Sequence, residues 1–490
     1  MRTRTRIVTL AGASALAIVV TALFASRVVR PRVEDQRLPW SRPQVERDLD
    51  RIATDTLRVL VMRDPLSWEP RPHAETGLEF ELIERFAKRM GLLLRALPMD
   101  HPDSMLMALQ RGEGDIIAAQ WTPRRSQRAW VSFSAPYRHV RPVIAVLRAD
   151  PLMQGKGATV APGSEADTAL VSPWSPFAQK LPGAPGNKVM RVHDTLISPE
   201  ELLMEVVLGR AQATLITDAR AAHESGRFPV LEFSAPMDPE LPLCFVVRRN
   251  AKGLLEALDE WLEDPDEREA HAQFFKVYGR PPGKPGPIAM RKRIPVENDS
   301  ISPFDEAFRL HAGGMRWGWE LLAAMAYRES RFDSTVTSRM GAQGIMQIMP
   351  RTGRKLGLDS SSAMSDHVAA AVRYLNKLDT MWMRAVPDRE QRLRFVLGSY
   401  NAGPGHIIDA QRLAESLGLD PDRWEHHVER AILLKAKPRY FMLPNMRNGY
   451  CDGSQVFHYV RDVTGLYRQL RSLDLPDRRM AGVVDTGRGE

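Results

Sequence analysis

The chain has 490 residues, a hydrophobic content of 43% and a formal net charge of +8. A chain of this size can bury more than one hydrophobic core, so we expect two or three domains. The positive charge would suit an anionic partner, but acidic residues are interspersed with the basic ones. The sequence also lacks an RNP aromatic motif and paired Cys/His ligands, so we predict no nucleic-acid binding. An acidic membrane surface or an anionic cell-wall polymer fits the charge equally well.

Cysteine usage gives no support for a metal centre. Cys244 and Cys451 are the two cysteines of the chain, too few for a disulfide framework or a zinc cluster. They fall in different predicted domains, so we expect two buried free thiols. We predict neither a metal nor another cofactor.

Residues 1–30 contain a charged and then an apolar segment of the kind that directs export. Three arginines among the first six residues precede an uncharged run over residues 7–26. We therefore predict that the protein leaves the cytoplasm. The run could span a bilayer of about 30 Å, and the cleavage pattern near Ala25 is poor because Leu23 stands two residues before it. Since cleavage after Ala22 stays open, the segment is either a signal peptide or a membrane anchor, and no lipoprotein cysteine follows it.

A leader over residues 31–55 precedes a region over residues 56–279 in which strands and helices alternate. TLRVLVM (56–62) has the pattern of a buried strand, and an amphipathic helix follows it. The expected apolar face of that helix consists of Leu78, Leu82, Phe86 and Met90. A further strand is predicted at residues 116–119, and a second α/β region from about Ala149.

Two passages of this region resemble each other. Residues 106–119 and 203–217 each read as an apolar helix, a glycine at its end and a strand. The repetition predicts two similar α/β lobes. With the order of its motifs, the region resembles the family 3 extracellular solute-binding domains, whose two lobes close on a small ligand. The motifs that carry the resemblance are TGLEFELIERFAKRMG, the G-x-x-D of Gly112 to Asp115, the F-S-x-P-Y of Phe133 to Tyr137, and Asp218.

The resemblance also implies ligand-binding residues. In the amino-acid binders of that family, an arginine before F-S-x-P-Y binds the ligand carboxylate and an aspartate of the second lobe binds its ammonium, a pairing that suits both groups. Here Arg125 or Arg128 could supply the arginine, with Arg128 preferred, and Asp218 the aspartate. The alternative is that the arginines are plain surface residues and that Asp218 caps a helix.

A stretch rich in proline and glycine, residues 280–294, reads as a linker. Beyond it, residues 295–470 show successive helical periodicities and almost no strand pattern, followed by a tail over residues 471–490. The second domain is therefore predicted to be all-α, so the chain as a whole combines a two-lobed α/β domain with a helical one.

One helix of this domain carries an acid on its apolar face. Trp317, Leu321 and Met325 are spaced four apart, and Glu329 is the next member of the stripe. Burial of a carboxyl group raises its pKa, which makes Glu329 a candidate general acid. Periodicity alone favours the other reading, in which Glu329 is an exposed residue on a fraying turn or the partner of Arg328.

The motifs that follow Glu329 decide between these readings. Together, and in this order, they resemble the family 1 lytic transglycosylases, whose catalytic domains have a goose-type lysozyme fold. Two positions depart from the family pattern, Ile345 in place of Leu and Ser399 in place of Ala. The matching residues are Glu329 and Ser330 for E-S, Ser338, Gly341, Ala342, Gly344, Met346 and Gln347 for S-x-x-G-A-x-G-L-M-Q, Tyr400 and Asn401 for A-Y-N, and Tyr459 for the final motif.

The resemblance implies that the chain cleaves peptidoglycan glycan strands without water, between N-acetylmuramic acid and N-acetylglucosamine, leaving a 1,6-anhydromuramoyl end. Glu329 would act as acid and then as base. Substrate binding would fall to Ser330, Ser338, Gly344, Met346, Gln347, Tyr400, Asn401 and Tyr459. Each also has a plain structural reading, with Met346 as core, Gln347 as a loop amide and Tyr459 as a packed helix residue.

Two other functions remain open. A hydrolytic muramidase would need a second carboxylate to activate water, for which Asp333 is the nearest candidate. A non-enzymatic periplasmic binding protein is the other alternative. The solute-binding region is a candidate sensor of wall-derived peptides or amino acids. The family resemblance implies the periplasmic side of the outer membrane, whereas an uncleaved N-terminal segment would place the protein at the inner membrane.

Overall fold

The computed structural model describes most of the chain between residues 42 and 473. The predicted export segment, the linker and residues 474–490 of the predicted tail lie outside the described residues. No helix within the described part has the length and apolarity needed to cross a bilayer. The described residues are 42–71, 74–148, 168–178, 189–193, 195–278, 300–338, 341–359 and 361–473.

The chain divides into two compact units, each taken by itself below. The first contains the described residues up to Trp68 together with Thr76–Arg138 and Pro242–Glu269. The second contains Glu69–Glu75, His139–Leu241 and the described residues from Ala270 onward. The second α/β lobe and the helical domain thus belong to one unit.

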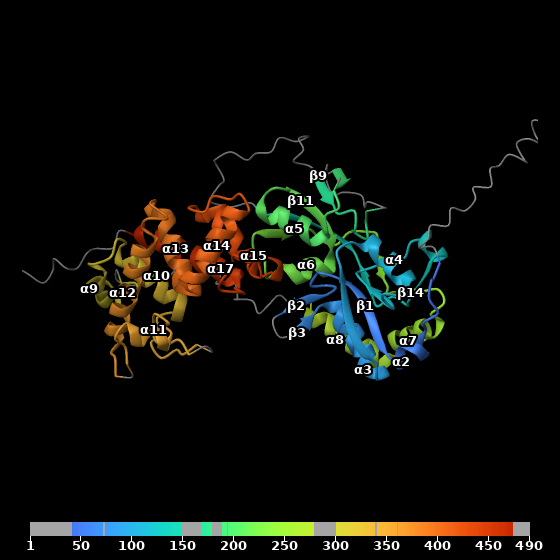
Figure 1. The fold of residues 1–490 in the computed structure, drawn as a ribbon. Coiled ribbons are helices and arrows are strands. Elements are labelled where there is room, and N and C mark those ends of the chain that lie inside the picture. The colour runs from blue at the N-terminus through green and yellow to red at the C-terminus, as the bar shows by residue number, and fades with distance from the viewer. Residues whose placement is uncertain are drawn as a thin grey trace, which may run out of the picture. The chain divides into compact units, whose positions relative to one another are not determined.

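The first unit is an α/β lobe built on one five-stranded sheet (Figure 1). The strand order is β4-β1-β5-β14-β6, in which β1 is parallel to β4 and β5, while β14 is antiparallel to β5 and β6. The predicted strand 56–62 is confirmed as β1. The elements are α2 (Leu49–Ala53), β1 (Thr56–Met62), α3 (Leu78–Met90), β4 (Leu93–Met99), α4 (Pro102–Arg111), β5 (Ile116–Ala118), η2 (Gln127–Ala129), β6 (Val131–Phe133), β14 (Val246–Arg248), α7 (Lys252–Glu263) and the start of α8 (Pro265–Tyr278).

The predicted apolar face of α3 is correct in three positions out of four. Leu78, Leu82 and Phe86 are buried, whereas Met90 is 39% exposed. Met90 is the last residue before the left-handed cap Gly91, where the helix turns away from the core it covers.

Residues 42–55, expected to be part of a leader, pack on the first lobe. Asp48 caps the first turn of α2 and also accepts hydrogen bonds from the backbone N–H groups of Gly253 and Leu254 at the start of α7, both at 2.8 Å. Arg47 pairs with the buried Asp115 at 3.0 Å. The contacts of Asp48 join residues about 205 positions apart, and that of Arg47 joins residues 68 positions apart, so a local sequence pattern does not reveal them.

The second lobe repeats the strand pattern of the first. Its sheet has the order β10-β9-β11-β8-β12, with β9, β10 and β11 parallel and β8 antiparallel to β11 and β12. The prediction of two similar lobes is confirmed, although the lobe begins at β8 and not near Ala149. Its elements are β8 (Pro142–Leu147), β9 (Thr168–Val171), β10 (Val189–Val192), α5 (Pro199–Leu208), β11 (Ala213–Thr217), α6 (Asp218–Glu224) and β12 (Leu231–Phe233). Two-stranded sheets are formed by β2 (Glu69–Arg71) with β3 (Ala74–Thr76), and by β7 (Arg138–Val140) with β13 (Leu241–Leu243).

Both repeats end their helices as predicted. Gly112 follows α4 and Gly209 follows α5, with φ angles of 76° and 77°. A residue with a Cβ is strained at such angles, so glycine ends each helix and lets the chain turn into the next strand.

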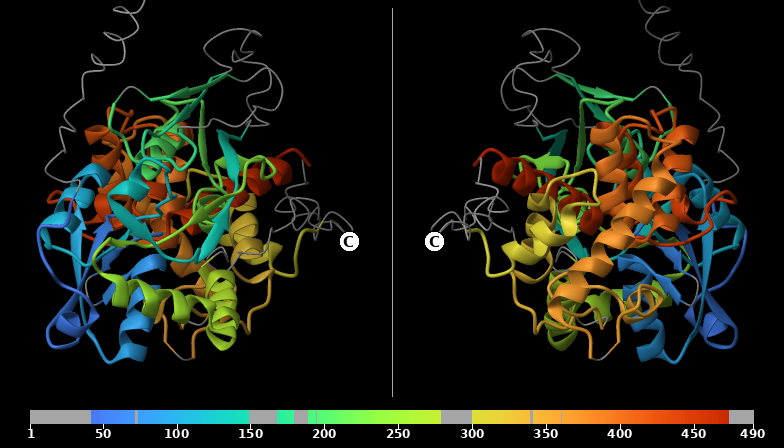
Figure 2. Two further views of the ribbon diagram at one scale, coloured as in Figure 1. Left: turned by 90° about the vertical axis from the view of Figure 1, so that its right-hand side faces the viewer. Right: turned by 90° about the vertical axis from the view of Figure 1, so that its left-hand side faces the viewer.

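The helical domain contains α9 to α17, and its described residues form no named strand. Helix α10 packs against α17, and α12 against α13 (Figures 1 and 2). The prediction of an all-α domain is confirmed. Its elements are α9 (Asp305–Ala312), α10 (Trp319–Ser330), α11 (Pro350–Lys355), α12 (Met364–Trp382), α13 (Arg389–Ala402), α14 (Pro404–Ser416), η5 (Trp424–Val428), α15 (Glu429–Leu434), α16 (Pro438–Phe441) and α17 (Gly453–Arg471).

A buried lysine joins the helical domain to the second lobe within the second unit. Lys437, just before α16, donates to Glu224 at 2.6 Å and lies 3.1 Å from Glu200. All three side chains are at least nine-tenths buried. Burial disfavours the charged form of Lys437, but the two carboxylates outweigh burial and raise its pKa.

Replacing Lys437 by Met should therefore destabilise the second unit by about 3–5 kcal/mol, because two buried carboxylates lose their counter-ion. Urea unfolding followed by hydrogen exchange in α5 and α6 measures this. Lys377→Met, an exposed change on α12, should alter stability by less than about 0.5 kcal/mol. Equal effects of the two substitutions would contradict the assignment.

Candidate active site

Helix α10 positions Glu329 at the end of a buried stripe. Leu321 and Met325 are fully buried, and Trp317, just before the helix, is 6% exposed. The helix stops one residue after Glu329, because Arg331 adopts a left-handed conformation (φ 55°) and donates its N–H to the carbonyl of Tyr327. The acid thus stands at the point where the apolar face ends and the chain turns away.

The carboxyl group of Glu329 is set in surroundings that favour its neutral form. Its side chain is partly accessible, but burial raises its pKa to about 7. A hydrogen-bonding interaction with Tyr459 and the charge of Arg328 act in the opposite direction and do not cancel this effect. Arg328 is no direct partner, because its Nε donates to Asp462 at 2.9 Å. Glu329 is therefore placed to be a proton donor near neutral pH.

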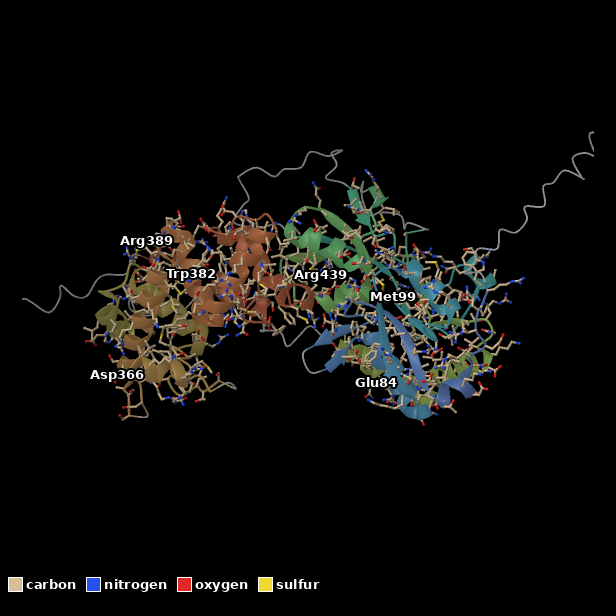
Figure 3. All side chains as sticks on the ribbon, in the orientation of Figure 1. Glu84, Met99, Asp366, Trp382, Arg389 and Arg439 are labelled. Atoms are coloured by element: carbon tan, nitrogen blue, oxygen red, sulfur yellow. The ribbon has the colours of Figure 1, made fainter. Side chains whose placement is uncertain are left out.

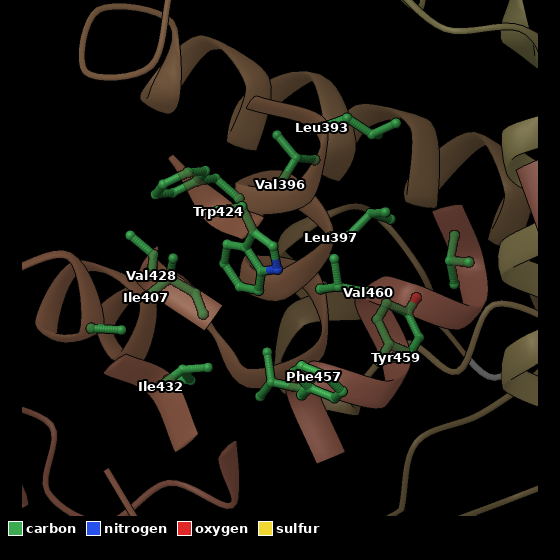
Figure 4. Packing of buried hydrophobic residues seen from close by; sticks show 14 of the residues in the cluster. Leu393, Val396, Leu397, Ile407, Trp424, Val428, Ile432, Phe457, Tyr459 and Val460 are labelled. Carbon is green, nitrogen blue, oxygen red and sulfur yellow. The ribbon is translucent and has the colours of Figure 1, made fainter. Parts of the chain in front are cut away.

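Two tyrosines from different helices face the acid. Tyr459 on α17 is 1% exposed and lies within the apolar cluster of the domain (Figure 4). Burial and then the negative charge of Glu329 raise the pKa of Tyr459 well above its ordinary value, and the same two causes act on Tyr400 of α13. No described residue offers Tyr459 Oη a partner at standard hydrogen-bond geometry, so its proton remains available to Glu329 or a ligand.

The G-A-x-G-I-M-Q segment forms a tight loop held by its own backbone. Ser338 Oγ accepts the N–H of Ala342 at 2.9 Å, and the carbonyl of Ser338 accepts the N–H of Gly341, also at 2.9 Å. Gly344 has a φ of 70°, and a Cβ at this position would lie 3.1 Å from the His367 ring. Glycine is needed there for conformation and for space. Ser338 therefore shapes the loop, whatever else it binds.

Gln347 has a positive φ of 45° and directs its amide into the loop. Its Nε2 donates to the carbonyls of Val336 at 2.9 Å and Gly344 at 2.8 Å. Both amide hydrogens are thereby used within the protein. Among the described residues nothing hydrogen-bonds its Oε1, which leaves an acceptor for a ligand donor.

Two predicted substrate-binding residues have other surroundings than expected. Ser330 is buried, and its hydroxyl lies 3.1 Å from the carbonyl of Ala326 and 3.0 Å from that of Ile345, so it ties the loop to α10 and does not contact the acid. Met346 is fully buried in the apolar cluster, which fits its alternative reading as a core residue. Its carbonyl accepts the Tyr400 hydroxyl at 2.8 Å, so its role is in packing and positioning.

The S-Y-N segment ends α13 beside the loop. Tyr400 and Asn401 are partly exposed, and the Tyr400 ring lies 5.5 Å from that of Tyr374. Ser399, which departs from the family pattern, is fully buried and accepts a hydrogen bond from the indole of Trp382 at 2.9 Å (Trp382 is labelled in Figure 3). The departure thus satisfies a buried indole N–H and leaves the site unchanged.

Asp333 does not supply a second carboxylate. It is exposed, and it accepts hydrogen bonds from the Thr335 N–H at 2.8 Å and hydroxyl at 2.6 Å. These bonds lower its pKa, which makes it a weak base. Among the described residues, no carboxyl group is one of the groups that shift the pKa of Glu329.

The two predicted ligand residues of the α/β lobes lie in different units. Arg128 is exposed and lies over the Phe133 ring at 5.7 Å. Asp218 is the first residue of α6, and its Oδ1 accepts the N–H groups of Arg141 at 3.2 Å and Ala219 at 2.8 Å. The helix cap is Thr217 and not Asp218, so the alternative reading of Asp218 as the N-cap is wrong.

Cys244 and Cys451 are both buried and free, as predicted.

Two domain families match the chain. Residues 57–280 match the bacterial extracellular solute-binding proteins, family 3, and residues 309–420 match the transglycosylase SLT domain. The second match includes Glu329 and ends before Tyr459.

Curated relatives match the chain over most of its length. The membrane-bound lytic murein transglycosylase F of Desulfosudis oleivorans is 28% identical, covering 81% of this chain and 85% of the relative. The protein of the same name from Ectopseudomonas mendocina is 26% identical, covering 89% and 88%. Among solved structures, an ancestral arginine-binding protein bound to arginine is 21% identical with a TM-score of 0.37, covering 46% of this chain and 97% of its own. That similarity is too low to support a statement about a ligand.

The sequence patterns did not point to three groups that surround the site. Asp462 engages Arg328, Tyr374 packs on Tyr400, and His367 lies against Gly344. All three lie on α12 or α17, far from the residues they contact. No periodicity links them, so only a pattern of paired variation among relatives could have indicated them.

The raised pKa of Glu329 predicts a pH-dependent effect on stability. Because the folded state favours the protonated acid, the contribution of Glu329 is most favourable below its unfolded pKa and is lost as pH rises through about 7. Glu329→Gln removes the ionisation, so it should stabilise the domain by roughly 1–3 kcal/mol at pH 8 and by little at pH 5. Thermal unfolding at both pH values tests this, and an equal effect at both would contradict the shift.

Proposed function

We infer that this chain, which combines a family 3 solute-binding domain with a transglycosylase SLT domain, is a peptidoglycan lytic transglycosylase. The observation that carries the chemistry is the environment of Glu329. This partly accessible acid has a pKa of about 7 and faces two tyrosines, and no second carboxylate acts on it among the described residues.

Glu329 acts twice in the proposed reaction. It first donates its proton to the glycosidic oxygen between N-acetylmuramic acid and N-acetylglucosamine, which lets the bond break. As a carboxylate, it then accepts the proton of the muramoyl C6 hydroxyl, whose oxygen attacks the anomeric carbon. The product is a 1,6-anhydromuramoyl end, and the acid is restored. A pKa near 7 suits a group that must both give and take a proton near neutral pH.

The neighbouring side chains have distinct tasks in this proposal. Tyr459 donates its unused proton to Glu329 when the acid is ionised, and thereby orients it. Gln347 accepts from a sugar amide or hydroxyl, and Asn401 binds the sugar beside it. Ser330 and Tyr400 position the loop through the carbonyls of Ile345 and Met346.

A hydrolytic muramidase is less well supported. Water is a poor nucleophile and needs a carboxylate base on the opposite face of the sugar. The nearest candidate in the sequence, Asp333, has a lowered pKa and is already hydrogen-bonded to Thr335. An internal hydroxyl held by the substrate itself removes this need.

For the N-terminal domain, we propose that it binds an amino acid or a wall-derived peptide through Arg128 and Asp218. The support is the family match together with the exposed guanidinium of Arg128. We propose a periplasmic location, because peptidoglycan is the proposed substrate. Its membrane association follows the names of the relatives, and the outer membrane is the preferred site if residues 1–30 are removed.

Glu329→Gln should abolish the release of anhydromuropeptides from purified sacculi, with a loss of about a thousandfold, because no second carboxyl group acts at this site among the described residues to protonate the leaving oxygen. Asp333→Asn serves as the control and should retain activity. Mass analysis identifies the product ends. Reducing muramic acid ends from the unaltered protein, or loss of activity in the Asp333 variant, would point to the hydrolytic reaction.

The pH dependence should follow the protonation of Glu329. Glu329 must be protonated in the free protein for the reaction to begin. Its ionisation should therefore leave kcat/KM constant below pH 6 and lower it about tenfold per pH unit above pH 8. Rates on soluble glycan strands between pH 5 and 9 measure this. A decline that begins near pH 5 would mean that Glu329 is not the acid.

A further inference from the structure

A pocket lies at the N-terminal end of α10, the helix that carries Glu329 near its C-terminal end. It has a volume of about 380 Å³ and is formed where the start of α10, the start of α13 and the end of α17 meet. Glu329 is about 16 Å away, since ten to eleven residues of α10 separate it from Gly318 at 1.5 Å each. The pocket is lined by Trp317, Gly318, Glu320, Arg389, Glu390, Leu393, Arg394, Thr464, Tyr467, Arg468 and Arg471.

The lining contains four arginines, and three of them have no acidic partner. Among the described residues, no carboxylate pairs with Arg389, Arg468 or Arg471. All three arginines are exposed, and Arg389 is labelled in Figure 3. Arg394 is the exception, because its buried guanidinium pairs with Glu425. The two acids of the pocket lie in the first turns of their helices, where they offset the helix dipoles.

Helix electrostatics accounts for only some of these arginines. Arg468 and Arg471 lie in the last turn of α17, where a cation is favourable. Arg389 is the first residue of α13, where a cation is unfavourable. Burial lowers the pKa of Arg394, and the charge of Arg468 lowers it further against the effect of Glu425. Arg468 thus repels Arg394, whereas the pocket's own Glu390 acts on Arg394 in the opposite direction. An anion bound by the exposed arginines would relieve this repulsion.

A tyrosine adds a donor and gives the pocket a firm wall. Tyr467 Oη accepts the N–H of Gly318 at 3.2 Å, which leaves its own proton free to be donated. Arg471 lies over the Tyr467 ring at 5.8 Å. Trp317 and Leu393 are buried and apolar. The wall therefore suits a ligand with an acidic end and an apolar part, such as a peptide carboxylate.

We propose that this arginine pocket binds a carboxylate of the peptide stem attached to the glycan substrate. The identity of the ligand as a peptide stem rests on the proposed function. The presence of an anion site rests on the arginines of the pocket alone. A stem of five residues reaches about 17–18 Å when extended, enough to run from a glycan near Glu329 to the pocket. The pocket would make the enzyme prefer strands that still carry stems.

The kinetic test compares strands with stems and the same strands after their stems have been removed. In Arg468→Gln/Arg471→Gln, the preference for stem-bearing strands, as the ratio of kcat/KM values, should fall about tenfold, chiefly through KM. The matched control Arg354→Gln/Arg384→Gln removes two exposed arginines outside the pocket and should keep the ratio. An unchanged ratio in the pocket variant, or an equal fall in the control, overturns the proposal.

A binding test separates this proposal from the proposed function. Full-length Glu329→Gln protein is titrated with a soluble stem tetrapeptide, and with inorganic phosphate, by calorimetry. Because the α/β domain is itself proposed to bind a wall-derived peptide through Asp218, the titrated protein also carries Asp218→Asn. In this background we expect tetrapeptide binding that weakens about tenfold when the pocket substitutions are added. Peptide binding that is insensitive to the pocket variant, or phosphate binding as tight as that of the peptide, overturns the stem assignment. Absence of glycan cleavage by the unaltered protein, with peptide binding intact, would refute the proposed reaction alone.

Discussion

The proposed chemistry of this protein depends on how folding changes the pKa of one carboxyl group, that of Glu329. Glu329 is placed by the apolar stripe of α10, so the same contacts that stabilise the helix also remove water from the acid. Arg328 is the cation that acts on Glu329, and an ion pair with it would lower the raised pKa of the acid, but its guanidinium pairs with Asp462 of α17. The acid consequently has a pKa of about 7, so a large fraction of it carries a proton near neutral pH. If Arg328 paired with Glu329, the carboxylate would be the stable form and the site would lack an acid.

The rest of the domain holds partners around this group. Ser330 and Tyr400 both bond to carbonyls of the G-I-M-Q loop, so the loop is fixed to the helices that carry the acid and the S-Y-N segment. Helix α17 supplies both Tyr459 and Asp462, and it packs along α10. The proposed catalytic acid, the tyrosine proposed to orient it and the aspartate that binds Arg328 therefore lie on two helices that pack together. The bonds of Ser330 and Tyr400 hold the shape of residues 341–348, which include the positive-φ glycines Gly341 and Gly344.

Much of this arrangement could be predicted from the sequence. Strand β1, the paired glycine caps of α4 and α5, the two lobes and the helical domain follow from local patterns of apolar residues and glycine. Glu329 was detectable because it places an acid on a helix stripe that is otherwise apolar. Ser330 and Met346 were predicted to bind substrate, and both side chains are buried. A motif identifies the residues of a site but does not give the orientation of their side chains. The contacts of Asp48, Lys437 and Asp462 join distant positions, and no local pattern encodes them.

The protonation state of Glu329 is the central claim, and it can be measured without substrate. Carbon-13 NMR of protein labelled at the glutamate Cδ, with Glu329→Gln to assign the signal, gives the pKa of this carboxyl group directly. The account predicts a titration midpoint about two units above that of the exposed glutamates, near 7. A midpoint between 4 and 5 would show that Glu329 is ionised at neutral pH, and that it is not the proton donor.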